Sequence, residues 1–395
     1  MRSRRARSSA LAGVPLSLTA LSACAFVMVG ASVLAPLLRG DLGLGPTGVG
    51  AIASAGYLGA LVTSRIGGRL SDSFGPERVI AAGLAVVLAG ALLASAASTA
   101  AVFYLGIFVI GGGYGHVNPA TSVLANPASA HLRGLAMSLK QSGIPVGGMA
   151  AGAALPGLGG HLGWRTALAV SGLACLLVCA WALRAGRSVR LRQTGGNRER
   201  AVVLAPSRVL LRLPLGYAYG PLVAGVQVTL FAMTAVYLVE ERSYTASQAG
   251  FGASLLLFGG LLGRPSWGFV SDRFPSHRIG VLQANAVIGA AGIAVLPVVP
   301  DVTVSFLLPV IGIGVAGWNG VYMAAVAEAR ADQVGGSTGT ALTLVNVGNV
   351  LVPLGTGAVV EHLASWRIAL LLCAALCLLA ACGLVFAREI VPSGE

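Results

Sequence analysis

The chain alternates between long apolar runs and short polar interruptions from one end to the other. Most apolar runs reach about 20 residues, the length that an α-helix needs to cross the roughly 30 Å hydrocarbon layer of a bilayer. The pattern therefore predicts an all-α membrane protein. Its twelve predicted transmembrane helices cover residues 15–38, 47–69, 78–98, 101–124, 135–157, 164–184, 213–238, 249–270, 278–299, 303–327, 338–360 and 366–387.

The longest polar segment, residues 184–208, divides these spans six and six. Most other interruptions are short. The predicted organisation is a basic cytoplasmic tail (1–14), an N-terminal six-helix bundle (15–184), a cytoplasmic linker (185–212), a C-terminal six-helix bundle (213–387) and a second cytoplasmic tail (388–395).

One charged sequence segment occurs twice, in similar form, about 200 residues apart. The segment GGRLSDSFGPER occupies residues 67–78, and WGFVSDRFPSHR occupies residues 267–278. The predicted fifth and eleventh spans also correspond at this offset, as do the entries GWR and SWR to the sixth and twelfth. These landmarks predict a parallel duplication of a six-span unit, which is the layout of transporters whose halves move about a central site.

Composition and charge agree with a membrane protein. The chain is 56% hydrophobic and 10% charged, whereas soluble domains carry about 25% charged residues. The net charge of +13 does not indicate nucleic-acid binding, because no basic surface interleaved with aromatics appears. With the N-terminus in the cytoplasm, four arginines (39, 165, 242 and 367) lie outside, leaving 25 − 4 = 21 inside. The predicted location is the cytoplasmic (inner) membrane, and the positive-inside rule predicts that both termini are cytoplasmic.

The chain resembles a bacterial transporter of the major facilitator superfamily, of the twelve-span type. The duplicated cluster carries that family's motif G-x-[LV]-[SA]-D-x-[FY]-G-x-[RK] at Gly68, Asp72, Gly75 and Arg78, and its second copy has Pro275 where the motif prefers glycine. The resemblance implies two pseudo-symmetric six-helix bundles. It also implies secondary active transport of a small organic solute by alternating access, coupled to protons or another gradient, in a monomer without cofactors.

Three other functions are compatible with a membrane location. A drug or metabolite efflux permease of the same superfamily is the alternative, although the first span lacks an acid and the fourth lacks an arginine. An enzyme is not expected, because the only lysine stands in SLKQS, which excludes a Walker A loop. No zinc motif or nucleophile elbow occurs either. A membrane sensor would need a larger soluble domain.

Polar side chains inside spans are costly and usually face an interior cavity. In the resembled family, spans 1, 4, 7 and 10 line that cavity, with spans 2, 5, 8 and 11 beside them. The predicted cavity residues are Tyr114, His116, Asn118, Lys140, Gln141, Gln227, Trp318, Asn319, Tyr322, Asn346 and Asn349. Trp318 and Asn319 are the preferred substrate contacts, because they pair a flat aromatic face with an amide on a glycine-flanked helix.

Several of these residues have a second interpretation. The Lys140 side chain could snorkel to the headgroups, His116 could bond a neighbouring helix backbone, and Asn346 and Asn349 could join helices by hydrogen bonds. If Lys140 faces the cavity, no acidic residue lies deep in a span to balance it. That arrangement predicts an anionic substrate, such as a small carboxylate.

The duplicated cluster is predicted to act as a gating latch at the cytoplasmic ends of spans 2 and 8. In the resembled family, the aspartate of one half faces the start of the fifth helix of the other half when the cytoplasmic side is closed. The predicted latch residues are Gly68, Asp72, Arg78, Arg133, Asp272, Arg273, Arg278 and Glu328. The alternative is that these charges only fix the topology.

Overall fold

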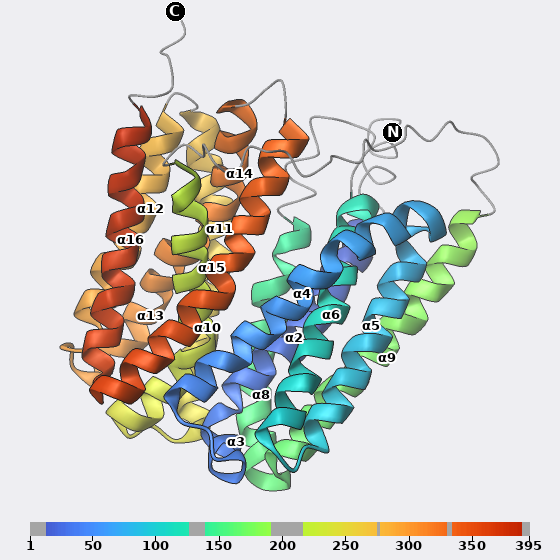
Figure 1. Cartoon of the computed structure of the whole chain (residues 1–395), viewed down its shortest axis with the longest axis horizontal. Coiled ribbons are helices and arrows are strands. Elements are labelled where there is room, and N and C mark those ends of the chain that lie inside the picture. The colour runs from blue at the N-terminus through green and yellow to red at the C-terminus, as the bar shows by residue number, and fades with distance from the viewer. Residues whose placement is uncertain (1–12, 126–138, 191–215, 275–276, 330–333, 389–395) are drawn as a thin grey trace, which may run out of the picture. The chain divides into compact units, whose positions relative to one another are not determined.

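The chain is helical throughout the part that the structure describes. This computed structural model describes residues 13–125, 139–190, 216–274, 277–329 and 334–388. Within these ranges every regular element is a helix (Figure 1). The helices of the N-terminal half are α2 (Val14–Val33), α3 (Ala35–Leu42), α4 (Pro46–Phe74), α5 (Pro76–Ser95), α6 (Ala100–Ala125), α8 (Gly143–Leu162) and α9 (Trp164–Arg190).

The C-terminal half continues the series with helices of 12 to 30 residues. They are α10 (Gly216–Arg242), α11 (Ala246–Arg273), α12 (Arg278–Val295), α13 (Asp301–Ala316), α14 (Trp318–Ala329), α15 (Val334–Leu363) and α16 (Trp366–Arg388). Among the described residues, eleven stretches are helical, long and apolar enough to cross a bilayer. The predicted all-α membrane fold is therefore confirmed.

The remaining predicted span, residues 135–157, falls on α8 and on residues 126–138, which lie outside the described part. The sequence of α8, GIPVGGMAAGAALPGLGGHL, is rich in glycine and contains two prolines. These residues lower its hydropathy, because neither contributes a large apolar side chain. The hydropathy of a span thus depends on how closely it packs against its neighbours, since close packing selects small residues.

Two predicted spans are each two helices. The first breaks between α2 and α3 at Leu34, where Pro36 cannot donate a hydrogen bond to the Ser32 carbonyl and also crowds it. The tenth breaks between α13 and α14 at Gly317. Both breaks lie inside predicted spans, and the sequence pattern does not indicate them, because hydropathy continues unchanged across each break.

The described chain forms two compact units. One comprises Met1–Gly45, Ala51–Gly195 and Ala232–Ser254, and the other comprises Pro46–Gly50, Gly196–Phe231 and Leu255–Glu395. In the first unit α5 packs on α6 and α9, while α2 packs on α8 and α6. In the second, α12 packs on α13 and α16, and α15 packs on α14 and α16. The boundaries of the two six-helix bundles stay a prediction.

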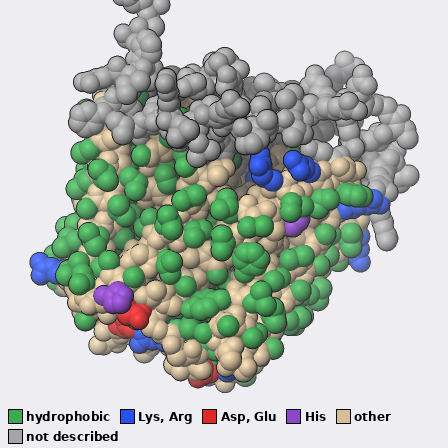
Figure 2. Space-filling model, viewed as in Figure 1, with side chains coloured by type: hydrophobic (Ala, Val, Ile, Leu, Met, Phe, Trp, Pro, Cys, Tyr) green, Lys and Arg blue, Asp and Glu red, His purple; other side chains and the backbone are tan. Residues whose placement is uncertain are grey.

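The outward-facing side chains are those of a protein that contacts lipid. Phe269, Val302 and Phe306 are about three-quarters exposed, and hydrophobic side chains run along the helices in Figure 2, with charged ones near the helix ends. Large exposed apolar areas are unusual on soluble monomers. The molecule is a multi-pass membrane protein.

Helices of the first unit approach each other closely at glycines. A Cβ atom at Gly111 would lie 2.6 Å from the carbonyl carbon and 2.8 Å from the Cα of Gly56 on α4. At the next residue, Gly112, the nearest atom to an added Cβ would be the Thr63 methyl carbon, at an ordinary 3.6 Å.

We therefore expect Gly111→Ala to destabilise the protein by about 1–3 kcal/mol, because the added methyl forces two backbones apart. Gly112→Ala is the matched control and should change stability little. Thermal unfolding of both purified variants in detergent measures the difference. Equal unfolding temperatures for the two variants would contradict the close approach of α4 and α6.

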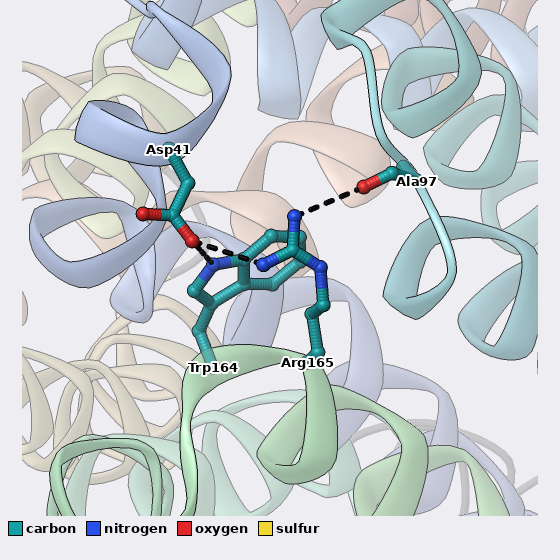
Figure 3. Close-up of polar contacts among 4 residues, drawn as sticks. All are labelled: Asp41, Ala97, Trp164 and Arg165. Carbon is teal, nitrogen blue, oxygen red and sulfur yellow. Dashed lines mark hydrogen bonds and ion pairs between the residues drawn. The ribbon is translucent and has the colours of Figure 1, made fainter.

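A polar cluster joins three chain segments of the first unit at the end of α3 (Figure 3). The Asp41 carboxylate accepts hydrogen bonds from the Trp164 indole (2.8 Å) and from Arg165 (2.9 Å), and Arg165 also donates to the Ala97 carbonyl (3.2 Å). The bond from Trp164, followed by the bond and charge of Arg165, holds the pKa of Asp41 below its ordinary value of 3.8.

A carboxylate whose pKa is lowered by folding stabilises the folded state at pH values above its unfolded pKa. This contribution decreases as the pH falls below the unfolded pKa and is lost once the pH is below the folded pKa. We expect Asp41→Asn to lower the unfolding temperature at neutral pH. The difference from the parent protein should shrink as the pH falls below the ordinary pKa of 3.8 and vanish only below the lowered pKa of the folded state. Trp164→Phe should produce the same pH dependence. A deficit that persists undiminished in acid would mean that Asp41 acts through packing alone.

Candidate functional site

The first site is built around the buried ammonium group of Lys140. Residues 139–141 are helical, Ser142 is a turn, and α8 begins at Gly143. Pro145 explains this interruption, because it lacks the N–H that would bond the Gln141 carbonyl. The Lys140 side chain is 2% exposed. The side chain therefore does not extend to the lipid headgroups, as a snorkelling lysine would.

The Lys140 ammonium donates to three neutral oxygens of α6. They are the Asn118 side-chain oxygen at 3.0 Å, the Asn118 carbonyl at 3.1 Å and the Ser122 hydroxyl at 2.5 Å. Asn118 in turn donates from its amide nitrogen to the Tyr114 hydroxyl at 3.3 Å. We call Tyr114, Asn118, Ser122 and Lys140 the Lys140 cluster. Among the residues that the structure describes, no carboxylate forms an ion pair with Lys140.

The second site lies at the break between α13 and α14, in the second unit. A helix end leaves the carbonyls of its last turn without helical partners, and in a membrane such groups need other donors. Here the Ile313 carbonyl accepts from the Trp267 indole (3.0 Å) and the Asn285 amide (3.2 Å). The Ala316 carbonyl accepts a long bond (3.4 Å) from Nε of Arg264.

Glycine at the break is required by close packing. A Cβ atom at Gly317 would collide with the Trp267 ring and lie 3.0 Å from the Gly263 carbonyl oxygen. Thus α11 supplies Arg264 and Trp267, which bond the end of α13, and also the surface against which the break fits, while α12 supplies Asn285. We call Arg264, Trp267, Asn285 and Gly317 the helix-break cluster.

An aromatic group packs beside this cluster. Trp318 donates its indole N–H to the Gln227 side-chain oxygen at 2.8 Å, and Tyr219 donates to the Leu282 carbonyl at 2.9 Å. Tyr322 donates to the Tyr217 carbonyl at 3.3 Å. Trp318 and Tyr322 are both 2% exposed. These rings fill the interior of the second unit, with Trp318 and Tyr322 centroids 5.7 Å apart.

The remaining predicted cavity residues fall into different environments. His116 contacts the carbonyl of Gly112 in its own helix at 2.8 Å, through Nδ1. Asn319, Gln141 and Asn346 are half-buried. Asn349 is 5% exposed, and its side-chain oxygen has no hydrogen-bond partner among the residues described. The structure therefore brings Asn118, Tyr114 and Lys140 together, and separately Gln227 and Trp318.

The predicted latch is only partly within the described residues. Asp272 and Arg278 approach to 3.6 Å, and Asp272 is 81% exposed. Arg273 and Arg78 are exposed, and Gly68 is half-buried. Arg133 lies outside the described residues, as do the side chains of Asp72 and Glu328. The latch stays a prediction.

Arg264 and Trp267 are site residues that the sequence interpretation missed. The arginine count assigned Arg264 to the cytoplasmic side, although it lies inside the predicted span 249–270. It stands eight residues before Asp272, which is about 12 Å along a helix. That depth is the signal that could have identified it.

The chain belongs to the Major Facilitator Superfamily, whose family model matches residues 16–342. It is 28% identical over 288 residues to an uncharacterized MFS-type transporter of Mycobacterium tuberculosis, covering 71% of this chain. It is 26% identical over 287 residues to the probable sulfoacetate transporter of Cupriavidus necator, covering 67% of this chain. The matches span 63% and 66% of the lengths of these two relatives.

A solved structure is similar in fold. It is a bacterial homologue of the human lysosomal transporter Spinster, in an inward-facing and occupied conformation. The TM-score is 0.73 at 17% sequence identity, with 97% of each chain covered. The likeness supports the fold, and the described helices agree with it.

Proposed function

We propose that this protein is a secondary active transporter that moves a small organic anion across the cytoplasmic membrane by alternating access. Membership of the superfamily and the multi-pass helical fold support transport. The inference that the substrate is an anion rests mainly on Lys140, a buried cation surrounded by neutral oxygens. A buried charge is strongly disfavoured unless it is compensated, so an anion near this group compensates it.

Arg264 supports the same substrate class from the second unit. It is half-buried within the candidate span Ala246–Arg273, and its guanidinium stays charged in proteins. An intramembrane cation marks a substrate or ion pathway more often than a structural site. The Cupriavidus relative is named for sulfoacetate, which carries two anionic groups. Proton coupling, a monomeric state and cytoplasmic termini complete the proposal.

Matched pairs of charged and neutral ligands test it. Propionate with propionamide, and methanesulfonate with methanesulfonamide, differ mainly in charge. We expect the anions alone to raise the unfolding temperature of the purified protein and to show counterflow in proteoliposomes. Equal effects of the neutral partners would reject an anionic substrate. Absence of transport for every organic acid tried, together with transport of neutral solutes, would reject it as well.

The latch proposal has its own test. Asp272 is 81% exposed and lies 3.6 Å from the largely buried Arg278 side chain. Such a long ion pair with one exposed partner contributes little stability by itself, so a loss of transport on mutation of Asp272 reports gating. We expect the Asp272→Asn variant to insert into the membrane normally and to transport up to tenfold more slowly. Labelling of cavity cysteines from the cytoplasmic side should increase. The size of the effect follows because a loss of about 1.4 kcal/mol changes the ratio of two conformations tenfold. Asp301→Asn, at the start of α13, is the control. Unchanged rate and labelling in Asp272→Asn would leave the charges a topological role only.

A further inference from the structure

The Nζ atom of Lys140 is bonded by oxygens that suit both protonation states of a lysine. Two of them, the Asn118 carbonyl at 3.1 Å and the Asn118 side-chain oxygen at 3.0 Å, can only accept hydrogen bonds. The third, the Ser122 hydroxyl at 2.5 Å, can accept or donate. An ammonium therefore donates three bonds at this place. A neutral amine donates two bonds to Asn118 and accepts the third from Ser122 with its lone pair.

The Ser122 hydroxyl has a second partner, which allows this exchange. It donates to the Asn118 carbonyl at 3.1 Å, and this is its arrangement beside an ammonium. The same carbonyl also accepts from the Thr121 hydroxyl at 2.8 Å, so it keeps a donor when Ser122 turns its hydrogen to the amine. Removing the extra proton from Lys140 therefore leaves neither Asn118 nor Ser122 without a partner.

The packing of the helices does not require a charge at this position. An added Cβ at Gly143 would collide with a backbone carbonyl of α2, and one at Gly348 would collide with a backbone carbonyl of α10. The two glycines thus make corresponding contacts in the two halves of the chain. Three residues before them stand Lys140 and Val345, which are 2% and 6% exposed. Because an apolar side chain fills the corresponding place in the second half, the amine of Lys140 serves a purpose other than packing.

The helices near the cluster supply no carboxylate that would hold Lys140 in its charged form. Helices α2, α6, α8 and α9 contain neither aspartate nor glutamate. The titratable residues of α2 and α6 are Cys24, Tyr104, Tyr114 and His116. His161 of α8 and the described arginine side chains of α9 are exposed. Burial disfavours the charged form of an amine, so the empty site favours the neutral amine and an arriving anion favours the ammonium.

We propose that Lys140 carries the coupling proton: its side chain is a neutral amine in the empty transporter and becomes an ammonium when the substrate anion binds. This inference rests on the proposed transport of an anion. The lone pair of Nζ forms the new N–H bond with a proton from the aqueous phase from which the anion enters. When the anion leaves on the other side, this bond breaks and the proton leaves with it. A monovalent anion and a proton thus cross together without net charge.

Proton uptake on anion binding tests this proposal in the purified parent protein. Methanesulfonate is the probe, with propionate above neutral pH as a second one, because both are then ionised and bring no proton. Calorimetric titration in buffers of different ionisation enthalpy counts the protons that the complex takes up. As the pH rises, we expect this count to approach about one proton per anion and the affinity to fall, because the neutral amine must then be protonated. Binding without proton uptake at every pH would overturn the proposal.

Lys140→Arg separates proton transfer from charge compensation, because a guanidinium keeps its charge in proteins. The variant should bind methanesulfonate without taking up a proton. In proteoliposomes it should retain counterflow, in which the loaded protein exchanges one anion for another. Uptake driven by a pH gradient should fall by about tenfold or more, since the empty protein would have to return with an uncompensated buried charge. Proton uptake that persists in Lys140→Arg would overturn the assignment to Lys140.

His116→Gln is the matched control, since His116 is the only other basic side chain on α6 or in the Lys140 cluster, and histidine commonly titrates near neutral pH. The proton count of this variant should equal that of the parent protein. A count that disappears in His116→Gln would assign the proton to the histidine and overturn the proposal. Should Lys140→Arg fail to fold, the counts for the parent protein and His116→Gln still decide between the two residues.

The two proposals fail in different ways. If the parent protein binds neither methanesulfonate nor propionate and transports no organic anion, the proposed function is wrong. If it binds an anion without proton uptake, the substrate class stands and only the role of Lys140 as the proton carrier is wrong.

Discussion

Replacing Lys140 with methionine is expected to reduce anion transport by about a hundredfold or more. The change removes the cation together with three hydrogen bonds, to two oxygens of Asn118 and to Ser122. Hydrogen bonds that involve a charged group contribute about 1.5–3 kcal/mol each, and each 1.4 kcal/mol corresponds to a factor of ten. Substrate binding needs to lose only part of this energy to give the expected effect.

The neighbouring residue provides a matched control. Leu139 is 38% exposed, so Leu139→Met introduces the same side chain one position away without removing a buried polar group. Transport in proteoliposomes and substrate-induced thermal stabilisation are the measurements. Lys140→Arg should retain part of the activity, because it keeps the charge but changes the donor geometry. Full anion transport by Lys140→Met, at normal expression, would mean that Lys140 does not compensate the charge of the substrate.

The chemistry of Lys140 also allows its position to be checked directly. Lys140 is the only lysine in the chain, so an amine-reactive reagent has one side-chain target. Because the side chain is 2% exposed and bonded to α6, labelling should be slow in the folded protein and rapid after denaturation. Rapid labelling of the folded protein would place the ammonium in an open space.

Sequence periodicity predicted the helices well because lipid imposes a simple rule on their length and hydropathy. It failed at the breaks, since neither Leu34 nor Gly317 changes the apolar character of its run. The break at Gly317 depends on Trp267 and Asn285, which lie on α11 and α12 and reach the Ile313 carbonyl from distant parts of the sequence. Such partners are fixed by packing, and packing cannot be read from one segment alone.

In the candidate site, too, single residues could be predicted from the sequence but their contacts could not. Lys140 was identified from its charge inside a span, and Asn118 from its place in the fourth span. Their contact could not be derived, because it depends on how the turn at Ser142 sits against α6. Trp318 was expected to contact substrate, yet its indole is bonded to Gln227, 91 residues away in sequence. An aromatic side chain beside glycines suits a ligand and a tightly packed interior equally well.

Arg264→Met is expected to lower anion transport by about tenfold to a hundredfold. The substitution removes an intramembrane cation and the donor that reaches the Ala316 carbonyl at the end of α13. An unsatisfied buried carbonyl costs about 1–3 kcal/mol, so the variant should also unfold at a lower temperature. Arg264→Lys separates the two effects, because lysine keeps the charge but lacks the planar Nε donor. It should recover transport more than stability.

Arg65 offers the matched control for Arg264. It lies in α4, seven residues before Asp72, whereas Arg264 lies eight residues before Asp272 in the second copy of the cluster. Arg65 is exposed, and Arg264 is half-buried. We expect Arg65→Met to change KM for the anion much less than Arg264→Met does. Equal losses in the two variants would mean that both arginines act through general charge near the duplicated cluster. A selective rise in KM for anions in Arg264→Met, with neutral ligands unaffected, would assign Arg264 to the substrate pathway.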